Sequence, residues 1–173
     1  MLISKKMNEA INRQIGNEFG ASLQYVAIAS YFVSEGLNLL AAHFYKQAEE
    51  ERTHAMKFVK YVVDAGGRVE IPAVPAPVSK FKTVEDAIKL SLEWEMTVTK
   101  QINQLLELSR QENDYTTENF LAWFVNEQLE EVSSMDRLLK VVRLAGPNNV
   151  LYVEEYIAHL KGGSEAEAGE TTT

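Results

Sequence analysis

The stretch G-R-V-E-I-P-A-V-P-A-P-V-S-K-F-K, residues 67–82, decides the architecture of this chain. It holds three of the four prolines, and it cannot be helical because proline lacks a backbone N–H and restricts the residue before it. Its 16 residues span about 50 Å when extended, at roughly 3.3 Å per residue. A helix of about 29 residues is roughly 43 Å long. These residues, here called the crossover, can therefore return along a whole helix.

Helix-start and helix-stop residues divide the rest of the chain into helical runs. Side chains that accept backbone N–H bonds stand before the runs, and glycines able to adopt a left-handed conformation stand after them. No strand-like alternation persists anywhere. We expect helices over residues 5–35, 38–65, 83–113, 114–145 and 149–160, with caps at Ser4, Asn38, Thr83 and Asp114 to Thr117, and stops at Gly36, Gly66 and Gly146.

Short turns join the first helix to the second and the third to the fourth, so each pair is antiparallel. The crossover makes the second and third helices parallel. The sequence thus predicts an all-α fold, a four-helix bundle with one long crossover between helices 2 and 3 and a short fifth C-terminal helix. We expect a single domain over residues 1–160 and a disordered acidic and polar tail over 161–173.

Composition excludes several classes of function. The net charge of -8 argues against nucleic acid or an anionic membrane as partner and permits attraction of cations. Without cysteine there is no disulfide, thiolate nucleophile, iron-sulfur cluster or thiolate zinc site, so oxygen and imidazole must hold any metal. The N-terminus has no signal-peptide core, and the longest apolar run is too short for a membrane span. We expect a soluble cytoplasmic protein.

Polar residues interrupt the apolar stripe of each long helix. Walking each stripe in steps of three and four reaches acid, imidazole or amide groups where leucine is expected. The helix midpoints fall near residues 19, 51, 98 and 130, so all the interruptions lie at mid-height and should form one layer. They are Glu18 in the first helix, Glu51 and His54 in the second, Glu95 in the third, and Gln128 and Glu131 in the fourth.

Four buried carboxylates repel one another and lose their hydration, so they need compensation. The stripes contain no lysine or arginine, which leaves protonation, water or metal. Two divalent cations balance the four glutamates when the imidazole is neutral. Carboxylate oxygen with little nitrogen and no sulfur suits Fe, Mn or Mg, and bridging carboxylates stabilise Fe(III). A dinuclear iron site is the most economical interpretation, although E-x-x-H at 51–54 alone would be weak support.

Four stretches together carry a resemblance to a known family: N-E-F-G-A-S-L-Q-Y at 17–25, E-E-R-T-H at 50–54, W-E-M-T-V-T-K at 94–100 and F-L-A-W-F-V-N-E-Q-L-E-E at 120–131. Over roughly residues 5 to 160 the chain resembles the non-haem bacterial and archaeal ferritins. The resemblance implies the ferritin-like form of the bundle. It also implies an iron-storage ferroxidase that oxidises Fe(II) with O2 or peroxide and deposits ferric mineral in a hollow homo-oligomeric shell, a 24-mer.

The resemblance also assigns residues to roles. It implies that Glu18, Glu51 and His54 hold one iron, and that Glu51 bridges to a second iron held by Glu95 and Glu131 near Gln128. Tyr25 lies on the interior stripe, where a phenol near iron could donate an electron. The family's third-site neighbourhood corresponds to Tyr25, Glu50, Glu127 and Glu130.

Two departures from related families narrow this expectation. The fourth helix carries Q-x-x-E at 128–131 instead of a second E-x-x-H, so one iron lacks an imidazole and should be held less firmly, which favours transit over a permanent cofactor. Arg52 stands where bacterioferritins have the haem-binding methionine, so haem is not expected.

Three other functions compete with iron storage. One is a di-iron oxidase or peroxidase that retains its metal pair as a permanent cofactor. Another is a DNA-protecting mini-ferritin, whose metals lie between subunits; the intrasubunit set and the acidic tail oppose it. The last is a structural bundle with a water-filled acidic layer.

Overall fold

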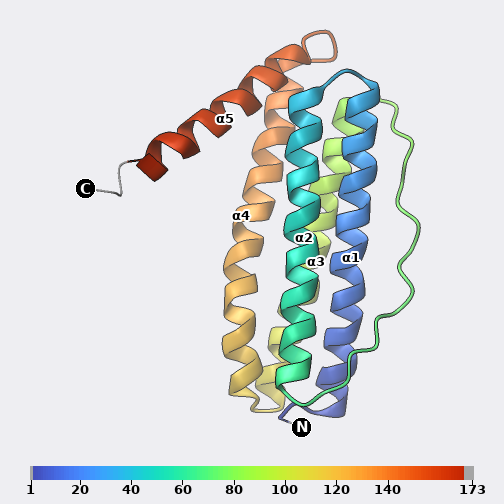
Figure 1. The fold of residues 1–173 in the computed structure, drawn as a ribbon, viewed down its shortest axis with the longest axis vertical. Helices are drawn as coiled ribbons and strands as arrows, with labels where there is room; N and C mark the ends of the chain where they lie inside the picture. The colour runs from blue at the N-terminus through green and yellow to red at the C-terminus, as the bar shows by residue number, and fades with distance from the viewer. Residues whose placement is uncertain (1, 170–173) are drawn as a thin grey trace.

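The computed structural model describes residues 2–169, with side chains described for residues 2–160. This part of the chain contains five helices and no strand, which confirms the predicted fold class. Four long helices lie side by side, and the fifth leans outward from one end of the bundle (Figure 1). The helices are α1 (Lys5–Ser34), α2 (Asn38–Asp64), α3 (Val84–Gln111), α4 (Tyr115–Ala145) and α5 (Leu151–Gly169).

The helix boundaries follow most of the expected local chemistry. Ser4 Oγ accepts the N–H of Met7 at 2.9 Å, and Thr83 Oγ1 accepts that of Asp86 at 3.1 Å. Asp114 caps α4 in the same way. The expected stops Gly36, Gly66 and Gly146 have φ values of 77°, 73° and 74°, in the left-handed region where glycine has no Cβ penalty.

The start of α2 differs from the expectation. Asn38 is the first residue of the helix rather than its cap, and Leu37 at the cap position offers no side-chain hydrogen bond. The free N–H groups of Leu39 and Leu40 instead donate to the two carboxylate oxygens of Glu154 in α5, at 2.9 and 2.7 Å. A carboxylate is well suited to the positive end of a helix. α5 therefore caps α2 from more than 100 residues away in the sequence.

The backbone of α5 runs to Gly169, beyond the expected end at Leu160. The tail prediction for 161–173 concerns residues whose side chains or placement lie outside the described part, so it stays a prediction. Within the part that is described, no helix is both long and apolar enough to cross a membrane.

The crossover takes the predicted path. It leaves the end of α2, follows the outside of α1 to the opposite end of the bundle, and enters α3, so that α2 and α3 are parallel (Figure 1). On α1 it meets residues of small size or with amide side chains, spaced four apart. These are Asn8, Asn12, Gly16, Gly20 and Gln24.

The amides of α1 bind the crossover backbone. Asn12 donates to the carbonyl of Arg68 at 2.8 Å and accepts the N–H of Glu70 at 2.9 Å. Gln24 contacts both backbone groups of Val78 in the same manner. Four residues of a helix rise about 6 Å, and two residues of an extended chain span about 6.6 Å. Every second residue of the crossover can therefore lie opposite every fourth residue of α1. The amide side chains of α1 thereby supply hydrogen-bond partners to an extended segment that has no neighbouring strand, at Arg68, Glu70 and Val78.

The glycines of this row let the crossover approach closely. A Cβ on Gly16 would lie 2.5 Å from Pro72 Cγ, whereas one on Gly20 would meet Trp94 and Val74 at ordinary distances of 3.5 and 3.6 Å.

The buried apolar residues form two clusters, one toward each end of the bundle. The cluster near α5 includes Tyr25, Phe44 and Met135, and the opposite cluster includes Ile15 and Phe124. In each long helix the polar interruptions fall between members of the two clusters. The core is therefore divided at mid-height by a polar layer.

Candidate metal centre

The polar layer contains all six interrupting residues, and all are buried. Their exposed fractions are 0% for Glu51 and Glu95, 1% for Glu18, 3% for His54 and Gln128, and 6% for Glu131. The sequence argument required these side chains to point inward at one height, and the structure places them so. Their roles as ligands remain predictions.

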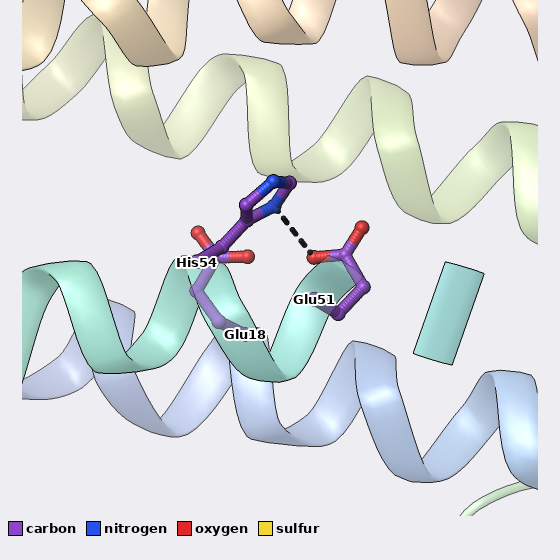
Figure 2. Close-up of side chains that lie close together, drawn as sticks. All are labelled: Glu18, Glu51 and His54. Carbon is purple, nitrogen blue, oxygen red and sulfur yellow. Dashed lines mark hydrogen bonds and ion pairs between the residues drawn. The ribbon is translucent and has the colours of Figure 1, made fainter. Parts of the chain in front are cut away.

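Glu18, Glu51 and His54 converge from two helices. Each offers one ligand atom within 4.8 Å of the other two, and Figure 2 shows their side chains grouped between the helices. His54 Nδ1 lies 3.3 Å from Glu51 Oε2. Glu18 Oε2 and Glu51 Oε1 are buried with no hydrogen-bond partner among the described residues. Unpaired buried carboxylate oxygens are costly, and a cation between them would relieve that cost. We call these three residues the inner group.

Gln14 supports the inner group and was missed by the stripe analysis. It is 2% exposed, and its Nε2 donates to Glu18 Oε1 at 2.8 Å. Its position one turn before Glu18 on the same helix was the available signal, because residues four apart share a face. Only one oxygen of Glu18 is therefore left for another partner.

Glu95 lies in a different environment from the inner group. One oxygen accepts the hydroxyl of Tyr25, and the other accepts Gln128 Nε2 at 3.3 Å. Thr99 in turn donates to Gln128 Oε1 at 2.8 Å and so fixes the orientation of the amide. Burial, with the neighbouring charge of Glu95, raises the pKa of the Tyr25 phenol well above 10. Tyr25 thus keeps its proton and acts as a donor to Glu95.

Glu131 lies near His54 but outside the inner group. Its Oε2 accepts Gln47 Nε2 at 3.0 Å. With His54 and Glu127 it forms a second group whose ligand atoms lie within 4.8 Å of one another, and we call this the outer group. Among the described residues only these two groups of three meet that distance, and Glu95 belongs to neither. The second iron was expected among Glu51, Glu95 and Glu131. The charges of Glu95 and Glu131 raise the pKa of Glu51, but the three carboxylates do not form a group whose ligand atoms all lie within 4.8 Å of one another.

The residues expected around a third site are spread out. Glu127 is half-buried and belongs to the outer group. Glu50 is half-buried and pairs with Lys46 at 3.0 Å. Glu130 is exposed and lies in neither group.

The carboxyl groups of the layer have raised pKa values. Burial is the main cause for Glu18 and Glu51, whose pKa values lie well above 4.5, and neighbouring carboxylates raise them further. Burial also raises the pKa of Glu95, although the bonds from Tyr25 and Gln128 lower it in part. For Glu131, burial and then the charge of Glu95 raise the pKa to about 8. The layer therefore takes up either protons or cations.

Known proteins are similar to this chain over most of its length. Residues 8–145 match the family model described as Ferritin-like domain. The chain is 43% identical to the protein named Ferritin BfrB of Mycolicibacterium smegmatis over 156 residues, which cover 90% of this chain and 86% of that one. It is 37% identical over 155 residues to the Bacterial non-heme ferritin of Staphylococcus aureus, covering 89% and 93% of the two chains.

A solved structure of an open pore ferritin from Archaeoglobus fulgidus superposes with a TM-score of 0.87 and 39% sequence identity, covering 90% of this chain and 96% of that one. The family model spans most of the chain, and these relatives extend over nearly the whole of both partners. With the bundle, the crossover and the buried carboxylate layer in place, this chain belongs to the ferritin family.

Proposed function

We propose that this protein is an iron-storage ferritin with ferroxidase activity. In this proposal Glu18, Glu51 and His54 bind one Fe(II), and Glu51 also bridges to a second Fe(II) near Glu95, Gln128 and Glu131. The observation that carries the proposal is the pair of buried oxygens without a hydrogen-bond partner on Glu18 and Glu51. No lysine or arginine is among the described buried residues to balance their charge. Iron is the substrate and cargo of this site.

The chemistry requires two electrons for each oxidant molecule. Two Fe(II) ions each give up one electron, and O2 with two protons becomes hydrogen peroxide. With peroxide as oxidant, two Fe(II) ions and two protons yield two water molecules. The carboxylates favour Fe(III) over Fe(II) because their negative charge is better matched by the higher charge. Tyr25, whose hydroxyl donates a hydrogen bond to Glu95, is proposed as an alternative source of one of these two electrons when only one Fe(II) is bound, and its phenolic proton is released in the same step.

The ferric product would leave the site for a mineral in the interior of a shell. We propose a cytoplasmic homo-oligomer of 24 subunits, supported by the ferritin names of the relatives and by the match to an archaeal ferritin structure. Q-x-x-E at 128–131, in place of a second E-x-x-H, puts Glu131 where a histidine would stand, so the second iron position lacks an imidazole ligand, which favours release over permanent retention.

One aerobic titration tests the proposal. Fe(II) is added stepwise to the metal-free protein while ferric absorbance and iron retained per chain are followed. Rapid oxidation with retention far above two irons per chain is expected. Retention of only two would indicate a permanent di-iron cofactor, and absence of accelerated oxidation would refute ferroxidase activity. Glu18→Gln should slow the oxidation at least tenfold, and Glu49→Gln, at an exposed position of α2, is the matched control.

A further inference from the structure

A cavity of about 690 Å³ lies between α1, α3 and the first half of the crossover. Its volume is within the range of about 300–1,000 Å³ that is typical of small-molecule sites. Side chains of both helices and prolines of the crossover, among them Pro72, form its walls. We call this cavity the crossover pocket.

The lining of the crossover pocket carries an excess of positive charge. Lys6 and Arg13 both line it, and neither forms an ion pair with another residue that the structure describes. Glu107 is the one carboxylate of the lining, and its Oε1 already accepts Gln111 Nε2 at 3.2 Å. A pocket with two cations and one carboxylate, in a chain whose net charge is -8, favours an anionic ligand.

The two cationic residues are spaced for a ligand with more than one negative group. Lys6 and Arg13 are seven residues apart on α1, so they lie on one face of the helix and about 10 Å apart along its axis. A guanidinium binds a carboxylate through two parallel N–H donors, and an ammonium attracts a second one as a point charge. A monovalent anion would leave one of the two cations without a partner. A small molecule with two or more carboxylates can contact both.

The pocket also holds an acceptor that lacks a donor. Gln101 lines the pocket from α3, and its Oε1 is buried with no hydrogen-bond partner among the described residues. A buried amide oxygen of this kind calls for an N–H or O–H group. An ammonium group on the ligand would be repelled by Lys6 and Arg13, whereas a hydroxyl group would not. The matching ligand therefore carries a hydroxyl beside its carboxylates.

Gln14 separates the pocket from the carboxylate layer. It lines the pocket and is 2% exposed. Its Nε2 donates to Glu18 Oε1 at 2.8 Å, and its Oε1 accepts Asn17 Nδ2 at 3.3 Å. Partners on both sides hold this amide in place, so the wall of the pocket beside Glu18 is formed before any ligand arrives. An anion in the pocket is kept apart from the carboxylates of the layer by this neutral side chain.

We propose that the crossover pocket binds a small polycarboxylate that carries a hydroxyl group. One carboxylate pairs with Arg13 and another with Lys6, and the hydroxyl donates to Gln101 Oε1. Binding of this anion requires no oxidation of iron. The inference therefore goes beyond the proposed function and is tested separately from it.

Citrate tests the proposal because it has three carboxylates and one hydroxyl. Tricarballylate, which lacks only the hydroxyl, is the matched ligand. Calorimetry on the assembled, metal-free protein at low ionic strength measures affinity and the number of sites per subunit, and a crystal structure with citrate locates the anion. The variants are Arg13→Gln, Lys6→Gln and Gln101→Leu. Lys5→Gln is the control, because Lys5 is exposed and next to Lys6 in the sequence but does not line the pocket.

The expected result is one citrate per subunit, located between α1 and α3. Arg13→Gln should weaken binding at least tenfold and Lys6→Gln at least threefold, while Lys5→Gln should leave it unchanged. Wild type should bind citrate more tightly than tricarballylate. Gln101→Leu should remove that preference, because it removes the acceptor of the hydroxyl. The melting temperature of each variant checks that it is folded.

Three results would overturn the proposal: no binding of citrate to wild type, an affinity that does not change in Arg13→Gln and Lys6→Gln, or a neighbouring subunit filling the pocket in the crystal structure. Equal affinity of wild type for citrate and tricarballylate would overturn the role of the hydroxyl. The proposed function fails on a different result, namely a protein that binds citrate as described but does not accelerate oxidation of Fe(II).

Discussion

Replacing Glu131 by glutamine should flatten the pH dependence of the stability of the metal-free protein. Burial and the charge of Glu95 raise the pKa of Glu131 to about 8, against an ordinary value of 4.5. A carboxyl group whose pKa is higher in the folded state contributes its full stabilisation below the unfolded pKa and loses it as the pH rises toward the folded pKa. The difference between the two pKa values, 8 − 4.5, is about 3.5, and each pKa unit corresponds to about 1.4 kcal/mol. Between pH 5 and pH 8, ionisation of Glu131 should therefore cost the wild-type protein about 3 to 4 kcal/mol per subunit.

The assay is denaturant unfolding of chelator-treated protein at fixed concentration between pH 5 and pH 8. The stability of Glu131→Gln relative to wild type should increase by about 3 to 4 kcal/mol across this range, while Glu49→Gln should follow wild type. Zn(II) should stabilise wild type more than Glu131→Gln at pH 8, because the cation replaces the proton. Stability curves that stay parallel for Glu131→Gln and wild type across the pH range would refute the reasoning.

Two further predictions concern the layer and the crossover. Glu51→Ala should lower the initial rate of Fe(II) oxidation at least a hundredfold, because it removes the proposed bridge between the two irons; a stopped-flow rate near that of wild type would contradict the bridge. Gly16→Ala should destabilise the fold by about 1 to 3 kcal/mol relative to Gly20→Ala, since a Cβ at Gly16 would overlap Pro72 while one at Gly20 makes ordinary contacts. Thermal unfolding of the two variants measures the difference, and equal melting temperatures would show that the crossover moves aside freely.

The local chemistry of the sequence was sufficient to predict most of the helix boundaries and the bundle that they form. Ser4 and Thr83 cap the helices that they precede, because their partners lie three residues away in the chain. Asn38 also has a side chain able to cap, but it lies one residue too late, inside α2, and Glu154 of α5 accepts the first free N–H groups of α2 instead. The difference is one of sequence distance: a cap supplied by another helix depends on how the bundle closes, and a local pattern holds no information about it.

The same distinction applies to the polar layer. Periodicity placed Glu18 and Glu131 at one height, because helix rise is constant and the helices have similar lengths. Periodicity could not determine which oxygens remain free, because that depends on amides such as Gln14 and Gln47 from neighbouring turns and helices. It also could not show that the two nitrogens of His54 lie near different carboxylates, because the orientation of the ring depends on packing between helices.

The α1 residues that contact the crossover, spaced four apart from Asn8 to Gln24, constrain the length of the crossover as well as its path. From Glu70 to Val74 the crossover advances two residues for each turn of α1. An extra residue there would reverse which side chains face the helix, and Pro72 would no longer lie over Gly16. Between Val74 and Val78 the chain has twice the residues that one turn needs. Natural or engineered insertions should therefore be accommodated at residues 75–77 and excluded from residues 70–74. Residues 75–77 are thus the suitable place to graft a peptide onto this protein.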